Sequence, residues 1–351
     1  MLLANAGGMQ ESREPWDEER AALLNRRISE LGLSIRGTRV ERMTSQLYEE
    51  LAARGLVFRP PVYLSDQWGC PEGIPLIGVP FYLADERLAR IEDEEAAGVE
   101  SDAESMRYLR HEAGHAFNYA YRLHERPEWR ALFGSFARPY RERFRVNPFS
   151  RDHVRHILGW YAQKHPDEDF AETFAVWMTP GLDWRREYAG WGALRKLEYV
   201  DRVLRDIGDD APDVPAPTAD DLPVEAMDYT VAEHYAGAHE GLPLDDARQF
   251  DGDLRTIFGD AGEAPGAEPA GGFIRRHRRE VVGRISYWTG EAATTVREFT
   301  NYLADRADAL ELRAGGLEAS TLIELTAFGT AVMMHFRLTD ALGSARPTDD
   351  A

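Results

Sequence analysis

The chain has 351 residues, and its 61 acidic and 41 basic side chains give it a formal net charge of −20. This length is sufficient for a real hydrophobic core, and 43% hydrophobic with 29% charged residues excludes a disordered or fibrous chain. Because the excess charge is acidic, we expect neither nucleic acid nor an anionic membrane surface as the main partner.

Neither the N-terminus nor the cysteine content suggests export. The opening residues MLLANA form too short an apolar segment for a signal peptide and have no basic residue ahead of them. No apolar stretch reaches the roughly 20 residues that span a bilayer. The one cysteine, Cys70, excludes an internal disulfide and is typical of a reducing compartment. We therefore expect a cytoplasmic protein.

The first 208 residues alternate between helical and strand-like patterns. Apolar residues at helical spacing predict helices over 17–31 and 37–54. Apolar runs at 56–58, 61–64 and 76–83, bounded by Pro and Gly, predict short strands. Together they indicate an α+β, mostly helical fold with a small mixed sheet. Further helices are expected at 102–123, 151–164, 167–178 and 191–207.

The charge changes abruptly after this region. Residues 209–270 contain 16 acidic and only two basic side chains, and both ends of the segment are rich in Pro, Gly and Ala, as linkers are. We predict a domain at 1–208, an acidic linker with short helices at 209–271, a C-terminal helical bundle at 272–342 and a tail at 343–351. The bundle helices are expected at 273–288, 291–312 and 317–340, and the last is apolar nearly all round, as a core helix is.

The segment from His111 to His115 reads His-Glu-Ala-Gly-His and matches the pattern H-E-x-x-H. On a helix, positions i and i+4 share one face, so both imidazoles can bind one cation. Glu112 projects about 100° away from His111 and lies beside the metal, where it can deprotonate a metal-bound water. The alternative is a pair of solvated histidines, but the small residues Ala113 and Gly114 favour close packing of other backbone against this face.

A catalytic zinc site needs a third protein ligand. Asn118 and Tyr121 occupy the positions where a metzincin has Gly and His, which excludes that class. Further along, a second helix is expected to begin at Pro166, with Glu168 and Glu172 on one face. Glu168 is the natural third ligand, and Glu172 can accept the free N–H of a zinc-bound histidine.

Five segments within the first 208 residues form a recognisable pattern. They resemble gluzincin-type metallopeptidases, in particular the bacterial family described as putative zinc-binding metallopeptidases. The second-helix pattern, Glu-x-Phe-Ala-Glu with a Tyr seven residues earlier, is similar to that of anthrax lethal factor. The segments are YLSDQWGCPEGIP (63–75), GVPFY (78–82), RHEAGHAFN (110–118), HPDEDFAETFA (165–175) and LRKLEYVD (194–201).

The resemblance implies a zincin-like catalytic domain and a zinc-dependent metallopeptidase that holds one Zn²⁺ per chain. The ligands would be His111, His115 and Glu168. Peptide bonds would be hydrolysed by a zinc-activated water with Glu112 as general base, while Tyr161 polarises the scissile carbonyl.

The same resemblance suggests where a peptide or protein substrate binds. In such folds the substrate commonly pairs with an edge strand, and 76–83 is the candidate, with Gly78 and Val79 as contacts. His165, which follows Lys164 at the start of the second helix, is a further candidate for contacting substrate. The C-terminal helices are candidates for binding a protein partner.

Two alternative functions stay open. The chain could be a non-catalytic regulatory or interaction protein that keeps zinc for folding. It could also be a peptide-deformylase-like amide hydrolase, because Cys70 precedes the H-E-x-x-H motif by a spacing similar to that of the deformylase cysteine ligand.

Overall fold

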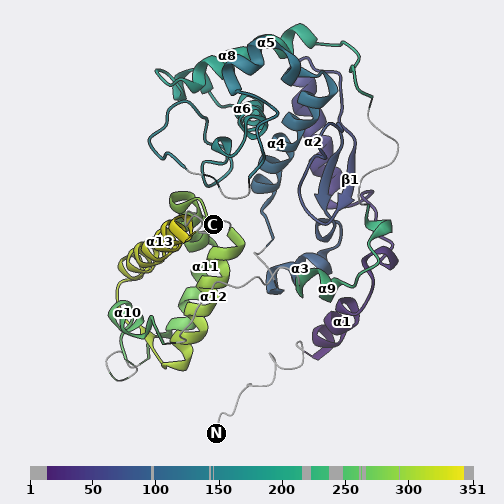
Figure 1. Ribbon diagram of the computed structural model, residues 1–351. Coiled ribbons are helices and arrows are strands. Elements are labelled where there is room, and N and C mark those ends of the chain that lie inside the picture. The colour runs from purple at the N-terminus through teal and green to yellow at the C-terminus, as the bar shows by residue number, and fades with distance from the viewer. Residues whose placement is uncertain are drawn as a thin grey trace, which may run out of the picture. The chain divides into compact units, whose positions relative to one another are not determined.

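The computed structural model divides the chain into two compact units, Met1–His239 and Glu240–Ala351 (Figure 1). Both units are mostly helical, and two short strands form a small sheet in the first, which confirms the predicted α+β class. No helix among the described residues is long and apolar enough to cross a membrane. The described residues are 14–95, 99–141, 144, 146–215, 223–236, 248–260, 262, 266–291 and 293–343.

Helices make up most of the first unit, and several were predicted closely from periodicity. The elements, in chain order, are α1 (Glu14–Leu24), η1 (Ile28–Glu30), α2 (Arg39–Ala53), β1 (Val62–Ser65), β2 (Ile77–Pro80), η2 (Phe81–Ala84), α3 (Glu86–Glu95), α4 (Asp102–Ala120), η3 (Leu123–Glu125), α5 (Pro127–Phe133), η4 (Tyr161–Gln163), α6 (Pro166–Met178), α7 (Trp184–Glu187), α8 (Ala193–Ile207), η5 (Val224–Ala226) and α9 (Val231–Ala236), where η marks a 3-10 helix.

Strand β2 is paired on both of its edges. On one side it runs parallel to β1, and the N–H of Ile77 donates to the carbonyl of Pro61 at 2.9 Å. On the other side Gly78 and Gly69 form an antiparallel bridge, with N–H···O distances of 2.7 and 3.2 Å. The predicted strand at 56–58 does not form.

Helices α4 and α6 lie side by side and form the frame of the candidate site (Figure 1). A capping box begins α4: the Ser101 hydroxyl accepts the N–H of Glu104, whose carboxylate accepts the N–H of Ser101. The helices approach closely at Gly114, where an added Cβ would lie 2.8 Å from Cα of Ala171. The small residues within the motif therefore allow the two helices to touch.

The helix predicted at 151–164 is wrong. This segment is irregular except for η4, and Gly159 and Trp160 have φ angles of 86° and 56°, in the left-handed region. Upstream of them, the N–H groups of His156 and Ile157 donate to the carboxylate of Glu172 at 3.2 and 2.8 Å. The backbone donors that a helix would have used internally are bound to a buried carboxylate instead.

The acidic middle of the chain contributes to both units. Val224, Met227, Val231 and Tyr235 are buried in the core of the first unit, whereas Leu254 and Phe258 are buried in the core of the second. The two compact units meet in sequence at residues 239 and 240, inside the predicted linker 209–271. The predicted domain boundaries themselves stay predictions.

The second unit is built from three long helices, as predicted. Phe273, Phe299 and Met333, one from each, lie in its buried core. The last helix buries Leu325 but leaves Ile323 exposed, so it is not buried all round as its composition suggested. The elements are α10 (Asp251–Ile257), β3 (Glu268–Pro269), α11 (Ala270–Thr289), α12 (Ala293–Ala309), β4 (Arg313–Ala314), antiparallel to β3, and α13 (Glu318–Gly343).

Candidate metal centre

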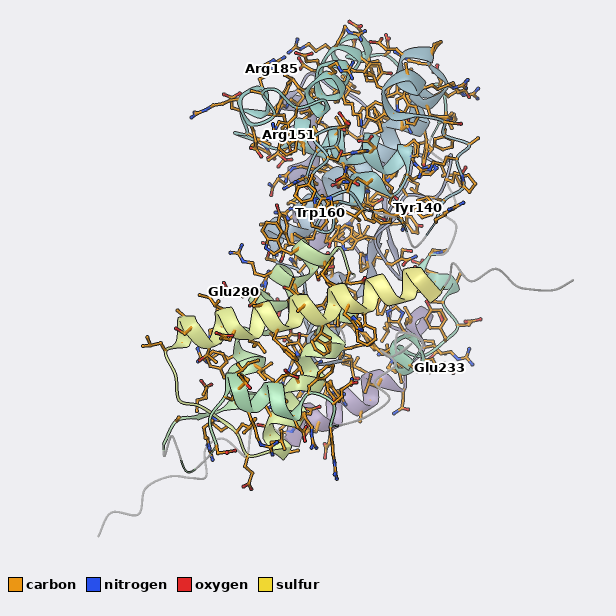
Figure 2. The ribbon with its side chains drawn as sticks, turned by 60° about the vertical axis from the view of Figure 1, so that its left-hand side comes forward. Tyr140, Arg151, Trp160, Arg185, Glu233 and Glu280 are labelled. Atoms are coloured by element: carbon orange, nitrogen blue, oxygen red, sulfur yellow. The ribbon has the colours of Figure 1, made fainter. Side chains whose placement is uncertain are left out.

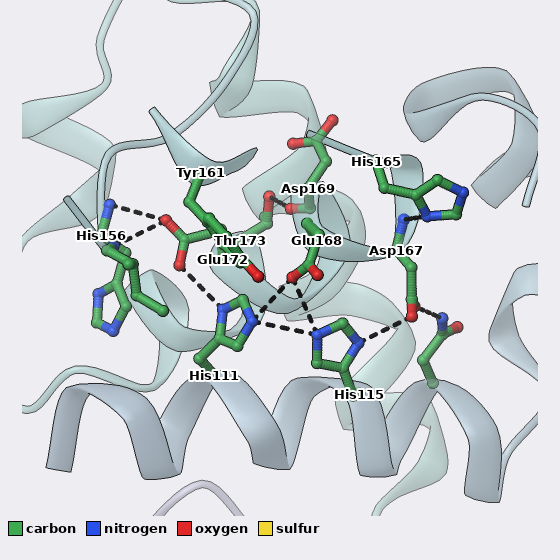
Figure 3. Close-up of polar contacts among 12 residues, drawn as sticks. His111, His115, His156, Tyr161, His165, Asp167, Glu168, Asp169, Glu172 and Thr173 are labelled. Atoms are coloured by element: carbon green, nitrogen blue, oxygen red, sulfur yellow. Dashed lines mark hydrogen bonds and ion pairs between the residues drawn. The ribbon is translucent and has the colours of Figure 1, made fainter. Parts of the chain in front are cut away.

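Three buried side chains from α4 and α6 converge on one point (Figure 3). The Nε2 atoms of His111 and His115 lie 3.1 Å apart. Oε2 of Glu168 lies 3.0 Å from the first of these nitrogens and 3.2 Å from the second. The sequence-predicted ligands therefore lie close enough together to form a metal site.

The far nitrogen of each histidine is held by its own carboxylate. Nδ1 of His111 lies 2.9 Å from Oε1 of Glu172, and Nδ1 of His115 lies 2.9 Å from Oδ2 of Asp167. A neutral imidazole that donates from Nδ1 keeps its lone pair on Nε2. Both lone pairs then face the same point as the Glu168 oxygen, which is how metal-binding histidines are oriented.

The donor set fits zinc. Two nitrogens and one carboxylate oxygen are ligands that zinc takes, and ligand atoms about 2.0–2.1 Å from a tetrahedral ion lie about 3.3 Å apart. Without a cation, lone pairs at 3.0–3.2 Å repel unless protons separate them. Burial alone would lower the pKa of His111, but hydrogen bonds to Glu168 and Glu172 outweigh it and raise this pKa to about 9. Without a bound cation these contacts favour the protonated imidazole of His111, so a cation would have to displace that proton to reach the lone pair on Nε2.

The charged forms of His115 and Glu168 are also favoured by their neighbours in the cluster. Burial opposes ionisation of His115, yet the neighbouring Asp167 and Glu168 raise its pKa well above the usual value. Burial likewise opposes ionisation of Glu168, but His115 and His111 hold its pKa well below the usual range. The carboxylate is therefore ionised and ready to bind a cation.

Asp167 is a further member of the cluster, and no motif in the sequence analysis singled it out. Its Oδ1 accepts a hydrogen bond from Asn118 at 2.6 Å, and its Oδ2 accepts the Tyr119 hydroxyl at 2.5 Å. Burial raises its pKa, but the charge of His115 and these contacts lower it overall. A signal existed in the sequence: a second zinc histidine also needs a carboxylate partner, and Asp167 adjoins Glu168.

Glu112 lies beside this network without joining it. Its side chain is buried, and no hydrogen bond to its carboxyl is found within the described residues. Burial raises its pKa, while His111 and His115 act in the opposite direction. A carboxyl group without a fixed partner is free to exchange a proton with a bound molecule.

Two tyrosines reach the cluster from the segment between α5 and α6. The ring of Tyr161 lies 5.6 Å from that of His111, and Figure 3 shows its hydroxyl directed toward the cluster. Burial raises the pKa of Tyr161, so its hydroxyl stays protonated. The Tyr140 hydroxyl lies 3.3 Å from that of Tyr161 and donates to Oε1 of Glu168 (Tyr140 is labelled in Figure 2). No motif in the sequence marks Tyr140.

The residues predicted to contact substrate have other contacts in the structure. Nδ1 of His165 accepts the N–H of Asp167 at 3.2 Å, and its Nε2 donates to the carbonyl of Arg138 at 2.7 Å. Gly78 is paired with Gly69, so a peptide can add to this edge only if that pair opens. Val79 is fully buried. Their substrate-binding roles stay predictions.

The thiol of Cys70, which would be a metal ligand in the deformylase alternative, is bound to a backbone carbonyl. Sγ of Cys70 donates to the carbonyl of Ile74 at 3.2 Å. Within the described residues, the group of potential metal ligands consists of His111, His115 and Glu168, and Cys70 is not a member. Burial, followed by the charge of Glu112, raises the pKa of the thiol well above its usual value, which keeps it neutral.

Comparison with known proteins gives one match. A family model described as "Putative zinc-binding metallo-peptidase" matches residues 100–183. No curated protein and no solved structure matches the chain. The matched segment runs from the start of α4 to beyond the end of α6 and includes every residue of the cluster described above. Residues 100–183 therefore carry the sequence pattern of a zinc-binding metallopeptidase family.

Proposed function

We propose that the protein is a zinc-dependent metallopeptidase that holds one Zn²⁺ per chain and hydrolyses peptide bonds with Glu112 as general base. One observation carries the proposal: three ligand atoms face one point, and beside them lies the buried carboxyl of Glu112, which has no hydrogen-bond partner among the described residues. The family match at residues 100–183 supports it independently.

Each residue then has a distinct task. His111, His115 and Glu168 would hold the ion, which would supply a Lewis acid and lower the pKa of a bound water toward 7. Glu112 accepts the proton of the attacking water and later returns it to the leaving amine. The protonated Tyr161 hydroxyl donates a hydrogen bond to the oxyanion that develops on the scissile carbonyl.

The test separates catalysis from metal binding. Glu112→Gln keeps the size of the side chain and removes its basicity, so we expect zinc content to stay at one per chain and cleavage to fall about 10²- to 10⁴-fold. Zinc content is measured by metal analysis, and cleavage is measured on an unfolded protein substrate and a proteome-derived peptide library. The exposed Glu128→Gln is the matched control, with wild-type cleavage expected.

Two results would overturn the proposal. Wild-type protein without stoichiometric zinc, or Glu112→Gln with unchanged cleavage, contradicts the assigned chemistry. A wild-type protein that binds zinc tightly and cleaves no peptide in the library would instead support the non-catalytic alternative.

A further inference from the structure

In the loop between α5 and η4, described residues on either side of Tyr140 are tied by hydrogen bonds to η4 and to the start of α6. The carbonyl of Arg138 accepts the His165 Nε2 proton at 2.7 Å. Farther along, Asn147 and Gln163 exchange two hydrogen bonds, of 2.8 and 2.9 Å, between backbone and side-chain amide. His165 also caps α6 through its other nitrogen, so one imidazole links the loop to the helix that carries Glu168. Arg138, two residues before Tyr140, is therefore held against the helix that carries Glu168.

Tyr140 lies on this loop and presents its hydroxyl to the cluster. The hydroxyl donates to Oε1 of Glu168 and lies 3.3 Å from the hydroxyl of Tyr161. The ammonium group of Lys164 lies 4.4 Å from the centre of the Tyr140 ring and 5.2 Å from that of Tyr161. One buried cation thus holds both phenol rings.

These contacts assign different tasks to the two oxygens of Glu168. Oε2 faces both histidine nitrogens, at 3.0 and 3.2 Å, whereas Oε1 is bound by Tyr140. A carboxylate whose second oxygen accepts a phenol proton binds a metal through one oxygen. Binding through both oxygens would add a fourth protein ligand atom and occupy the position that a catalytic zinc site leaves open.

The same hydroxyl sets the direction of the Tyr161 proton. A phenol has one proton, and Tyr140 gives it to the charged acceptor Glu168, so its oxygen is left to accept the proton of Tyr161. The Tyr161 oxygen is thereby held in place, and its proton must turn from Tyr140 toward the oxyanion when a carbonyl arrives.

We propose that Tyr140 is a positioning residue of the metallopeptidase proposed above. Its hydroxyl keeps Glu168 a one-oxygen zinc ligand and holds the oxygen of Tyr161 in position. This inference rests on the proposed function for its catalytic consequence, but its effect on metal binding is measurable without any substrate.

The test uses Tyr140→Phe in the full chain. Loss of the hydroxyl frees Oε1 of Glu168, so we expect zinc affinity, measured by competition with a chelating dye, to fall about 10- to 100-fold. In the Co²⁺-substituted protein, binding through both oxygens raises the coordination number, so the visible absorption should weaken and shift. The side chain of Tyr140 is 50% exposed, so the fold should tolerate the change.

Two control variants separate the effect of the Tyr140 hydroxyl on metal binding from the loss of any buried hydroxyl and from the loss of the catalytic hydroxyl. Tyr121→Phe removes a hydroxyl that bonds the carbonyl of Asp210, away from the cluster, and should leave zinc affinity and the cobalt spectrum unchanged. Tyr161→Phe should lower kcat while leaving both metal readouts unchanged. Tyr140→Phe should lower kcat with KM nearly unchanged.

The outcomes distinguish this inference from the proposed function. Tyr140→Phe with wild-type zinc affinity and a wild-type cobalt spectrum overturns the role of Tyr140, whatever the activity. A wild-type protein that cleaves no peptide overturns the proposed function, while the two metal readouts still decide whether Tyr140 positions Glu168.

Discussion

Glu172 accepts the Nδ1 proton of His111 at 2.9 Å and is itself held by the backbone N–H groups of His156 and Ile157. Its carboxylate thus joins the motif helix α4 to the irregular segment that leads into Tyr161. The orientation of a metal-facing imidazole and the path of the neighbouring chain depend on the same side chain.

Glu172→Ala should therefore weaken both metal binding and folding. His111 loses the partner that orients it, so zinc affinity should fall about 10- to 100-fold. The two backbone N–H groups lose their acceptor in a partly buried place, which should cost about 1–3 kcal/mol of unfolding free energy in all. Zinc titration and urea denaturation measure the two effects. Wild-type values in both would show that the carboxylate does not organise the site.

Zinc affinity should depend steeply on pH. The pKa of His111 in the metal-free protein is raised to about 9, so at pH 7 zinc must displace a proton to bind. Affinity should rise about tenfold for each pH unit between 6 and 8 for each proton displaced. Isothermal titration in buffers of different ionisation enthalpy counts the released protons, and a pH-independent affinity would contradict the raised pKa.

The same pKa shift predicts how metal-free stability changes with pH. A histidine whose folded pKa lies above its unfolded value stabilises the fold fully below about 6.5, and this contribution is lost as pH rises through about 9. The metal-free protein should lose stability over that range. Zinc-loaded protein should lose less, because the metal replaces the proton. Thermal melting with and without a chelator provides the comparison.

The core of the candidate site could be predicted because its spacing is local. His111 with His115, and Glu168 with Glu172, follow the i, i+4 rule of one helix face, which needs no knowledge of the rest of the chain. Tyr140 could not be found this way. Its contact with Glu168 depends on the path of an irregular loop, which periodicity does not describe.

In the fold, too, the elements with a local sequence pattern were predicted, and those that depend on contacts distant in sequence were not. Long amphipathic helices such as α2, α8 and α11 were predicted within a few residues, because burial of one face imposes a period on the sequence. The segment 151–164 was wrongly predicted as a helix because its backbone donors bind Glu172, a partner distant in sequence. Sparse apolar residues in an acidic segment, such as Val224 and Met227, gave no local sign that they join a core.

Gly114→Ala should separate α4 from α6. The new Cβ would lie 2.8 Å from Cα and 3.0 Å from the carbonyl oxygen of Ala171, and backbone atoms of a packed helix cannot move away individually. The overpacking should cost about 1–3 kcal/mol of unfolding free energy. Zinc affinity should fall as well, because α4 carries both histidines and α6 carries Glu168. Gly283→Ala in α11 is the control: apart from the backbone of its own helix and its chain neighbours, no atom of the described residues lies within 4 Å of the new Cβ, and removing a mid-helix glycine should stabilise by about 0.5–1 kcal/mol. Unchanged melting and zinc binding in Gly114→Ala would contradict the close approach of the two helices.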